Sequence, residues 1–551
     1  MQAKAGYYIQ FQSFVNMNHL RSPKTNHAFL SWSLLLALSL AGMILLFICT
    51  SQWGVGASVD SIAYIGGARE IIKGNGYRSQ ISGSPITQWP PLFSAALALI
   101  GFSGIDPLDA ARILNGILFG LNIFLVGIIL KKYTNSTLTA SLGSFFMVAS
   151  HSMALIHGTA WSEPLFILWS LIVCFCLTQY LETGSKLMLI CGAVGAALAC
   201  LTRYVGISLI ATGGIMILFF NSRNWKKRFL DCSLFLAVSF LPLGLWFVRN
   251  RLSAGNLTHM DHQFHPPTWN FFASLFPTVT AWLFPPLWPE FLKNAVLITV
   301  AGLTLAAFIV NMIKKPDEAS NSNWLTSPPF RFCLSLVFFG VFYFGMLIFH
   351  RTFADVDIKV SSRYMSPLYA TSLLFVLMII HRWLTSYRPH FLVKGLLFCL
   401  VTLLGFASVT HAYVHYSKLY YKGTQYTSRK WRIAETITKL KDLPRSPVIY
   451  SNAPTSIYFL LGQPAKRLPK KYDDEHVTKN QTDKPATDYL EFLSAIKVKL
   501  AAKKGYIVLF NSKVSIKQKW FEIPPEELKE RLSLVPVAEL KDGIIYQVEQ
   551  T

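Results

Sequence analysis

Ionisable side chains are scarce in this sequence of 551 residues. Asp, Glu, Lys and Arg together make up 14% of the chain, hydrophobic residues make up 52%, and the mean hydropathy is +0.39. Charged residues form about a quarter of an ordinary soluble domain, so this composition excludes a soluble globular protein. The sequence therefore predicts a multi-pass membrane protein, with the lipid bilayer as one of its partners.

Acidic residues are the scarcer of the two charge types. The chain has 51 Lys and Arg against 28 Asp and Glu, a net charge of +23. In a soluble protein such an excess is typical of nucleic-acid binding. Here several basic residues lie in short loops between apolar runs, where they are expected on the cytoplasmic side of a membrane. No nucleic-acid partner is therefore expected.

The sequence has no clear metal-binding pattern. Its eight cysteines all fall in apolar stretches without a C-x-x-C pair, and we interpret them as packing residues. Three histidines occur at i, i+3, i+6 in His259-Met260-Asp261-His262-Gln263-Phe264-His265, but Pro266-Pro267 follow at once and disfavour the tight helix this spacing needs. A solvated or substrate-contacting loop is the preferred interpretation. No cofactor is expected to be required, and a divalent metal stays open without being indicated.

Apolar runs long enough to cross about 30 Å of hydrocarbon define the predicted architecture. We find eleven, to within one or two, the first of them a retained signal anchor. Basic loops at 131–132, 223–228, 314–315 and 382–388 all fall on the side of the N-terminus, which is therefore predicted to be cytoplasmic. The odd count then places the C-terminus outside. The predicted spans are 28–50, 108–130, 137–157, 164–181, 187–202, 204–220, 229–248, 294–313, 331–350, 364–384 and 392–414.

The polar segments divide the chain into three parts. Residues 1–27 form a cytoplasmic segment, and residues 28–416 form a transmembrane domain with long outer loops at 51–107 and 251–293. Residues 417–551 hold 24 Lys and Arg, 15 Asp and Glu, and short β-like runs at 448–450 and 507–510 beside a helical pattern at 431–440. This part predicts a small extracytoplasmic α/β domain, serving either acceptor recognition or capping of the outer face.

Acids limit where extracytoplasmic chemistry can occur. Residues 1–416 contain thirteen Asp and Glu, and nine of these are predicted outside or at the outer boundary. Asp60 follows the first span and begins an amphipathic helix to Lys73 that is expected to lie along the membrane surface. Asp60 and Tyr64 are four residues apart and lie on the same face of this helix, so the carboxylate and the phenol are expected to point at the same spot. From local sequence alone, a helix N-cap is the simpler role for Asp60.

Other polar residues stand at the outer ends of predicted spans. Glu163 precedes Pro164 at the start of a span, where an acid favours the helix dipole and Ser162 is a plausible cap. Arg203 and Tyr204 interrupt an apolar stretch, so Arg203 either snorkels to the headgroups or holds an anion. Two further arginines and one tyrosine also stand at outer span ends: Arg249, Arg363 and Tyr364. This position suits either contact with a phosphate-bearing ligand or anchoring at the membrane interface.

A series of short motifs extends from the first outer loop to the tenth predicted span. In chain order they read Asp60-x-x-x-Tyr64-x-x-x-Ala68, Gly74-x-Gly76-Tyr77, Trp89-Pro90-Pro91-Leu92, Ser162-Glu163-Pro164, Leu201-Thr202-Arg203-Tyr204, Trp246-x-x-Arg249-Asn250 and Arg363-Tyr364-x-x-Pro367. Together they resemble the polyprenyl-phosphate-sugar-dependent glycosyltransferases of the C-type membrane fold, the group of the protein O-mannosyltransferases and lipid A aminoarabinose transferases.

The resemblance implies transfer of a hexosyl or pentosyl unit, with inversion, from a polyprenyl-phosphate donor to a hydroxyl on a lipid, glycan or protein outside the cytoplasm. In that family the first-loop acid, Asp60 here, is the proposed base, which reverses the preference for an N-cap. Because a phosphate is a good leaving group, one carboxylate and a clamp of positive charge suffice without a metal. The implied phosphate-binding candidates are Arg78, Arg203, Arg249 and Arg363, and the donor or acceptor contacts are Tyr64, Glu163, Tyr204 and Tyr364.

The resemblance has departures. Gln88-Trp89 stand where the aminoarabinose transferases have Glu-Lys, so this chain lacks a phosphate-binding lysine there and arginines must supply the charge. The C-terminal part shows no repeats of the kind expected in a eukaryotic protein mannosyltransferase. We therefore expect a bacterial member with an unassigned acceptor, in the inner or plasma membrane.

Two other function classes remain open. The first is a transporter or lipid-linked-glycan flippase, which would favour ionisable residues near the bilayer midplane and inverted repeats. Acids gathered at the outer boundary and the absence of a visible repeat favour the enzyme. The second is an enzyme-derived protein that has lost its catalytic activity and serves as a scaffold through its outer domain. The presence of Asp60 argues against this alternative.

Overall fold

The computed structural model describes most of the chain. The described residues are 23–258, 264, 266–313, 324, 327–353, 360–387, 389–469, 489–511 and 524–549. Residues 1–22, the three histidines and Asp261 of the 259–265 loop, Lys314-Lys315, Asp355, Asp357 and Arg388 lie outside them.

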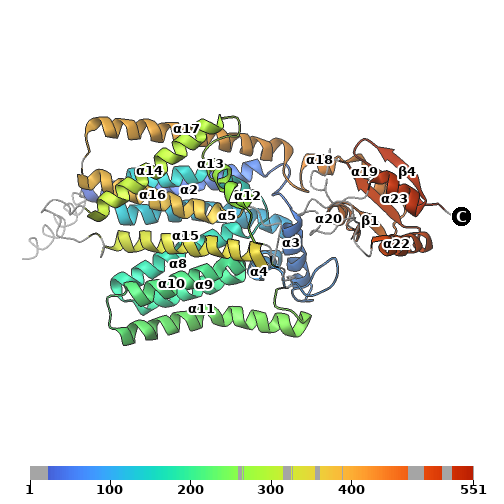
Figure 1. Cartoon of the computed structure of the whole chain (residues 1–551), viewed down its shortest axis with the longest axis horizontal. Helices are drawn as coiled ribbons and strands as arrows, with labels where there is room; N and C mark the ends of the chain where they lie inside the picture. The colour runs from blue at the N-terminus through green and yellow to red at the C-terminus, as the bar shows by residue number, and fades with distance from the viewer. Residues whose placement is uncertain are drawn as a thin grey trace, which may run out of the picture.

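Long apolar helices form a bundle in which most helices run side by side (Figure 1). Eight of the described helices are long and apolar enough to cross a membrane, and a bent pair makes a ninth. The eight are α2 (Pro23–Cys49), α5 (Pro107–Thr134), α8 (Glu163–Thr183), α11 (Trp225–Ala254), α14 (Glu290–Ile313), α15 (Pro328–Phe353), α16 (Ser366–Tyr387) and α17 (Phe391–Lys422).

The remaining predicted spans fall on shorter or broken helices. The run 137–157 is α6 (Thr137–Val148) followed by α7 (His151–His157), with a bend of 58°. The runs 187–202 and 204–220 correspond to α9 (Lys186–Thr202) and to η1 (Tyr204–Gly206) with α10 (Ile207–Phe220). Each predicted run is thus helical, and the count of eleven spans stays a prediction.

The centre of the bundle is α8, the most deeply buried of the long helices. It packs against α9, α5 and α15, and small residues allow other helices close approach. A Cβ at Gly143 of α6, for example, would lie 2.2 Å from Cδ1 of Leu130 on α5. This packing fixes the end of α8 that carries Glu163.

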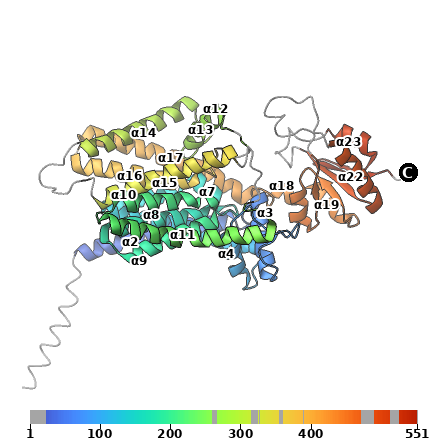
Figure 2. The same cartoon turned by 60° about the horizontal axis from the view of Figure 1, so that its bottom comes forward.

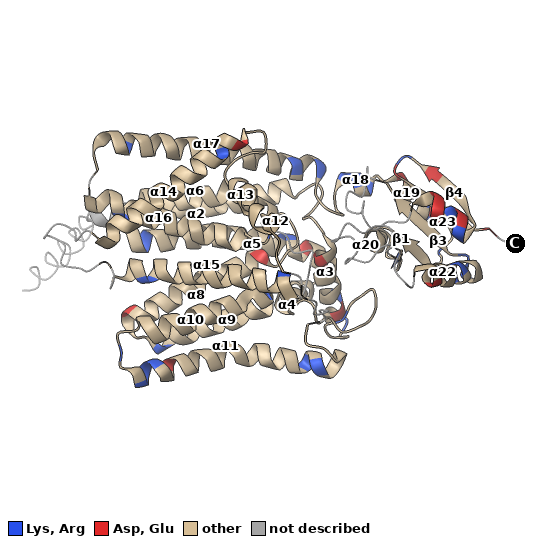
Figure 3. Cartoon of the chain, in the orientation of Figure 1, with Lys and Arg blue, Asp and Glu red and all other residues tan. Residues whose placement is uncertain are grey.

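Charged residues lie mainly toward the two ends of the bundle, leaving a long middle with few of them (Figure 3). The end where α2 begins also holds the basic start of α11, with Lys226, Lys227 and Arg228. At the opposite end, two helices of the predicted first outer loop, α3 (Val59–Ile72) and α4 (Leu92–Gly101), pack together beside α5. Figure 2 again shows α3 between the bundle and the C-terminal domain.

The second long loop predicted to be outside, residues 251–293, contains two short helices. These are α12 (Trp269–Ala273) and α13 (Leu275–Thr280), and they contact each other and then α14. The histidine segment that precedes them is the part outside the described residues.

The C-terminal part is a five-stranded sheet with helices on both faces, as the fold prediction required. The strand order is β2-β1-β3-β5-β4, with β1 parallel to β2 and β3, and β5 antiparallel to β3 and β4. The strands are β1 (Ile449–Ser451), β2 (Lys466–Arg467), β3 (Tyr506–Phe510), β4 (Leu534–Leu540) and β5 (Gly543–Val548).

Alternating side chains of β3 build two cores. Tyr506, Val508 and Phe510 face α18 (Arg429–Arg432), α19 (Glu435–Asp442) and α20 (Pro454–Leu461), whereas Ile507 faces α22 (Tyr489–Lys503) and α23 (Pro525–Leu532).

The helical pattern over 431–440 is divided between two helices, α18 and α19, with a break at residues 433–434. The carboxylate of Asp542 accepts hydrogen bonds from the backbone N–H and the hydroxyl of Thr436, so a residue 106 positions later holds the start of α19. No local pattern encodes this contact.

Candidate active site

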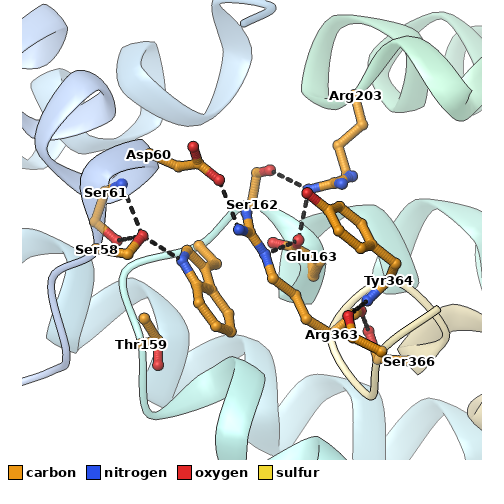
Figure 4. A network of polar contacts seen from close by, with 12 residues as sticks. Ser58, Asp60, Ser61, Thr159, Ser162, Glu163, Arg203, Arg363, Tyr364 and Ser366 are labelled. Atoms are coloured by element: carbon orange, nitrogen blue, oxygen red, sulfur yellow. Dashed lines mark hydrogen bonds and ion pairs between the residues drawn. The ribbon is translucent and has the colours of Figure 1, made fainter. Parts of the chain in front are cut away.

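Asp60 lies in the first turn of α3, and the residue that caps this helix is Ser58. The Ser58 hydroxyl oxygen accepts a hydrogen bond from the backbone N–H of Ser61 at 3.4 Å. The N-cap role considered for Asp60 is therefore wrong. Asp60 is left with its carboxylate directed at a residue far along the chain, Arg363 (Figure 4).

Glu163 is the first residue of α8, and its side chain is fully buried. Ser162 occupies the N-cap position, but its side chain makes no capping hydrogen bond, in contrast to the prediction. Its hydroxyl oxygen instead lies 3.2 Å from both the Tyr64 hydroxyl and Nη1 of Arg203. Ser162 thereby links α3, which carries Tyr64, to the start of α8.

Arg363 joins the two carboxylates. Its Nη1 donates to Oδ2 of Asp60 at 2.6 Å, and its Nε donates to Oε1 of Glu163 at 2.6 Å. The guanidinium also lies over the indole of Trp161, with Cζ 4.1 Å from the ring centroid. A planar group with several fixed donors suits two carboxylates reached in different directions, as a lysine would not.

Arg203 is the second cation of the cluster. Its Nη1 forms an ion pair with Oε1 of Glu163 at 2.7 Å, and its guanidinium lies 6.0 Å from the ring of Tyr364. Its Nε is buried and has no hydrogen-bond partner in the part of the chain that the structure describes. We call Asp60, Glu163, Arg203 and Arg363 the four-charge cluster (Figure 4).

The four-charge cluster is electrically balanced, and its four side chains differ in exposure. Two carboxylates face two guanidiniums, with side-chain exposures of 0% for Glu163, 15% for each arginine and 25% for Asp60. Asp60 is therefore the most accessible of the four side chains, while the fully buried Glu163 contacts both guanidiniums.

The electrostatics of the cluster keep its arginines charged. Burial acts to lower the pKa of Arg363, but the Glu163 and Asp60 carboxylates outweigh it and raise that pKa. Burial is also the main cause that raises the pKa of Tyr64 and of Tyr364, so both phenols stay protonated at neutral pH. The cluster offers fixed positive charge and neutral hydroxyls.

Two supporting residues were not predicted as site residues. The Trp161 indole N–H donates to the Ser58 hydroxyl oxygen at 2.8 Å, so the residue beneath Arg363 also contacts the α3 cap. The Tyr343 hydroxyl donates to the backbone oxygen of Tyr364 at 2.6 Å and fixes the loop that carries Arg363. Trp161 directly precedes Ser162-Glu163 in the sequence, which was the available signal for it, whereas Tyr343 had none.

Three predicted site residues lie apart from the four-charge cluster. Arg249 donates from Nη1 to the Ile86 oxygen at 3.0 Å and from Nη2 to the Tyr77 oxygen at 2.9 Å. Tyr204 donates to the Thr87 oxygen at 2.6 Å. These two residues brace the first outer loop. The third, Arg78, donates to the Gly83 oxygen within that loop.

The described residues contain no group of three His, Cys, Asp or Glu side chains arranged to hold a metal ion. The two carboxylates of the four-charge cluster have guanidinium partners instead.

The fold has relatives among solved structures. No family model and no curated protein sequence matches the chain. The chain is similar to ArnT from Cupriavidus metallidurans in the apo state, with a TM-score of 0.50, 14% identity, and coverage of 96% of this chain and 99% of that one. For ArnT bound to undecaprenyl phosphate, the TM-score is 0.50 at 13% identity, with coverage of 93% of this chain and 97% of that one.

The archaeal oligosaccharyltransferase AglB from Archaeoglobus fulgidus, in complex with an inhibitory peptide and a dolichol-phosphate, gives a TM-score of 0.48 at 12% identity, covering 88% of this chain and 70% of that one. The likeness to ArnT extends over nearly the whole of both chains. The chain therefore shares its fold with ArnT, in agreement with the fold predicted from the sequence.

Proposed function

We propose that this protein is a membrane glycosyltransferase that moves a monosaccharide from a polyprenyl-phosphate donor to a hydroxyl acceptor. The observation that carries the proposal is the four-charge cluster, in which the most exposed member, Asp60, pairs with Arg363, and Glu163 joins Arg363 to Arg203. It occurs in a chain that shares its fold with ArnT, a protein crystallised with undecaprenyl phosphate. Fixed cations beside an accessible carboxylate suit a reaction in which a phosphate leaves and a hydroxyl loses its proton.

The proposed step is a single displacement at the anomeric carbon. The acceptor oxygen bonds to this carbon, while the bond between the carbon and the phosphate oxygen breaks. The leaving polyprenyl phosphate keeps the bonding electron pair, and Asp60 accepts the proton of the acceptor hydroxyl. Attack opposite the leaving phosphate inverts the anomeric centre.

Arg363 and Arg203 are the groups we assign to the phosphate. Arg363 already contacts Asp60 through Nη1, so a phosphate held by Arg363 lies next to the base. Arg203 brings a buried Nε without a partner among the described residues. Charge-assisted hydrogen bonds from such groups to a phosphate strengthen as negative charge develops on it.

Glu163 serves as the buried anchor in this scheme. Its Oε1 contacts both guanidiniums, at 2.7 Å and 2.6 Å, and its side chain has no exposed surface. It therefore holds the two cations side by side, and the phosphate meets both at once.

The distribution of charge supports an extracytoplasmic site. The basic start of α11 lies at the bundle end where α2 begins, and α3 with Asp60 lies at the opposite end. Since basic loops mark the cytoplasmic side, we assign the N-terminus to the cytoplasm and the four-charge cluster with the C-terminal domain to the outer face.

The test is sugar transfer by purified protein in nanodiscs with a panel of polyprenyl-phosphate monosaccharides. We expect wild type to release free polyprenyl phosphate, and Asp60→Asn to reduce turnover by about 10²- to 10⁴-fold with donor binding kept. Asp106→Asn is the matched control, because Asp106 is also an outer aspartate paired with an arginine, Arg69, and asparagine can still cap α5.

Wild-type turnover by folded Asp60→Asn would remove Asp60 from the role of base. If no donor released polyprenyl phosphate while proteoliposomes showed substrate-dependent flux, the transporter interpretation would replace the enzyme.

A further inference from the structure

The segment between α17 and the C-terminal domain passes directly beside the chain that leads to Asp60. We call residues 423–428 the connector; α17 ends at Lys422 and α18 begins at Arg429. The C-terminal domain is thus attached at the site end of the bundle, next to α3 (Figures 1 and 2).

Backbone hydrogen bonds join three strand-like segments at this point. The Tyr426 N–H donates to the Ala57 oxygen at 3.0 Å, on one side of residues 55–57. On the other side, the Gly56 N–H donates to the Gly158 oxygen at 2.9 Å, and the Ala160 N–H donates to the Gly56 oxygen at 2.8 Å. Residues 55–57 are therefore held between the connector and residues 158–160.

Two of these three segments, the central residues 55–57 and residues 158–160, lead to the four-charge cluster. Ala57 immediately precedes Ser58, which caps α3, and Asp60 follows in the first turn. Ala160 precedes Trp161, which lies under Arg363, and then Glu163. A displacement of residues 55–57 thus moves Asp60 relative to Arg363.

Side-chain packing leaves no free space in this contact. A Cβ at Gly56 would lie 2.4 Å from Cγ2 of Thr424 and 3.3 Å from Oγ1 of Thr159. Thr427 is fully buried, and its hydroxyl lies 3.0 Å from the Val55 oxygen and 2.9 Å from the Thr424 oxygen. The connector therefore meets residues 55–57 in a single close-packed register.

Two further contacts tie the C-terminal domain to the same loop. Helix α20 packs against α3, and the Arg432 guanidinium at the end of α18 lies 5.9 Å from the ring of Trp53. The connector contact is thus part of a continuous surface between the domain and the first outer loop.

We infer that the connector is a positioning element that sets Asp60 in register with Arg363, so that the C-terminal domain controls the geometry of the site. For its effect on turnover, this inference rests on the proposed function. Thr424 and Thr427 are positioning residues in this scheme, because they touch the segment before Asp60 and not the reacting groups. A misplacement of about 1 Å is enough to cost roughly 10²-fold in rate.

The test enlarges one side chain and shortens the other at the contact between Gly56 and Thr424. Gly56→Ala introduces the clashing Cβ, and Thr424→Ser removes the methyl group that it would meet. We expect Gly56→Ala to lower kcat by about 10- to 100-fold with affinity for undecaprenyl phosphate unchanged. Thr424→Ser alone keeps wild-type kcat, and the double variant recovers most of the loss.

A second pair of variants, at Thr427, tests the same contact without introducing a steric clash. Thr427→Val removes the hydroxyl and Thr427→Ser keeps it, so we expect only the valine variant to lose kcat. Thr436→Val is the matched control, because its buried hydroxyl bonds within the C-terminal domain, to Asp542, away from the connector. It destabilises that domain but leaves the kcat of the folded protein unchanged.

Hydrogen–deuterium exchange gives a readout that does not need activity. In Gly56→Ala and Thr427→Val, peptides covering residues 55–64 exchange faster, and the double variant with Thr424→Ser restores protection. Faster exchange together with inactive wild type would reject the proposed function and leave the positioning contact standing. Unchanged exchange, or a kcat loss that Thr424→Ser does not rescue, would overturn the inference while the proposed function stands.

Discussion

Arg363 Nη1 lies 2.6 Å from Oδ2 of Asp60, although 303 residues separate them in the chain. The same guanidinium donates through Nε to the buried Glu163. The bond to Asp60 uses one carboxylate oxygen and leaves Oδ1 for the proton of an acceptor. Arg363 therefore connects the proposed base with the group that holds the cluster together.

Replacing Arg363 by lysine keeps the positive charge but removes the planar guanidinium that contacts two carboxylates. One ammonium cannot occupy both the Nη1 position at Asp60 and the Nε position at Glu163, so we expect kcat/KM to fall by about 10²-fold. Steady-state transfer assays measure this loss. Arg69→Lys, in an exposed pair with Asp106, is the control and keeps wild-type kcat/KM. Full activity of Arg363→Lys would show that a point charge is sufficient.

Arg203 and Arg249 are predicted to differ in phosphate binding. Arg203 lies in the four-charge cluster, whereas Arg249 is engaged by the backbone oxygens of Tyr77 and Ile86. Arg203→Ala is expected to weaken binding of undecaprenyl phosphate by about 10- to 100-fold, the range for losing charged hydrogen bonds. Equilibrium binding with labelled lipid measures the loss.

Arg249→Ala should leave that affinity within about twofold and instead increase proteolysis of the 74–91 segment, since the side chain contacts that segment, Asn250 and Trp246 but not the four-charge cluster. A large affinity loss in Arg249→Ala would place the phosphate nearer to Tyr77 than we propose.

Glu163→Gln tests the anchor. The substitution keeps the shape but leaves two adjacent guanidiniums without their shared carboxylate. Breaking a buried ion pair by removing one partner costs about 3–5 kcal/mol, so the midpoint of thermal unfolding in detergent should fall by several degrees. Glu182→Gln is the comparison, because Glu182 accepts a hydrogen bond from the amide of Gln179 at 2.9 Å and does not join two guanidiniums as Glu163 does. An unchanged midpoint in Glu163→Gln would show that the ion pairs contribute no net stability.

Tyr64→Phe should have a small effect. The Tyr64 hydroxyl makes one 3.2 Å contact, to the Ser162 hydroxyl, while its ring packs edge-on against Trp89 and Phe93. Because phenylalanine keeps the ring, we expect stability to fall by about 1 kcal/mol and kcat by less than about fivefold. A rise in acceptor KM without that small loss of stability would instead make Tyr64 an acceptor contact.

The sequence predicted the helices of the bundle better than the contacts between them. Apolar length alone located α2, α5 and α17, because a span must satisfy its backbone internally. The extent of α17 to Lys422, beyond the predicted end at 414, was not visible, since its last turns are polar and continue toward the C-terminal domain.

Site residues were predictable by type and by their position at span ends, but not by partner. Arg249 and Arg363 both stand at the end of an apolar run, and only the fold shows that backbone oxygens engage one and carboxylates the other. The capping role of Ser58 shows the same limit, because Ser and Asp are equally good caps and local sequence cannot choose between them.

The distance along the chain between Asp60 and Arg363 has a consequence for biogenesis. At about 5–20 residues per second, a ribosome needs roughly 15 to 60 seconds to reach Arg363 after making Asp60. The connector emerges later still, after α17 has been synthesised. Nascent chains therefore carry the Asp60 carboxylate before Arg363 and the connector have been made. Under the proposed function, we expect a product that stops short of α17 to be inactive, because it lacks the connector.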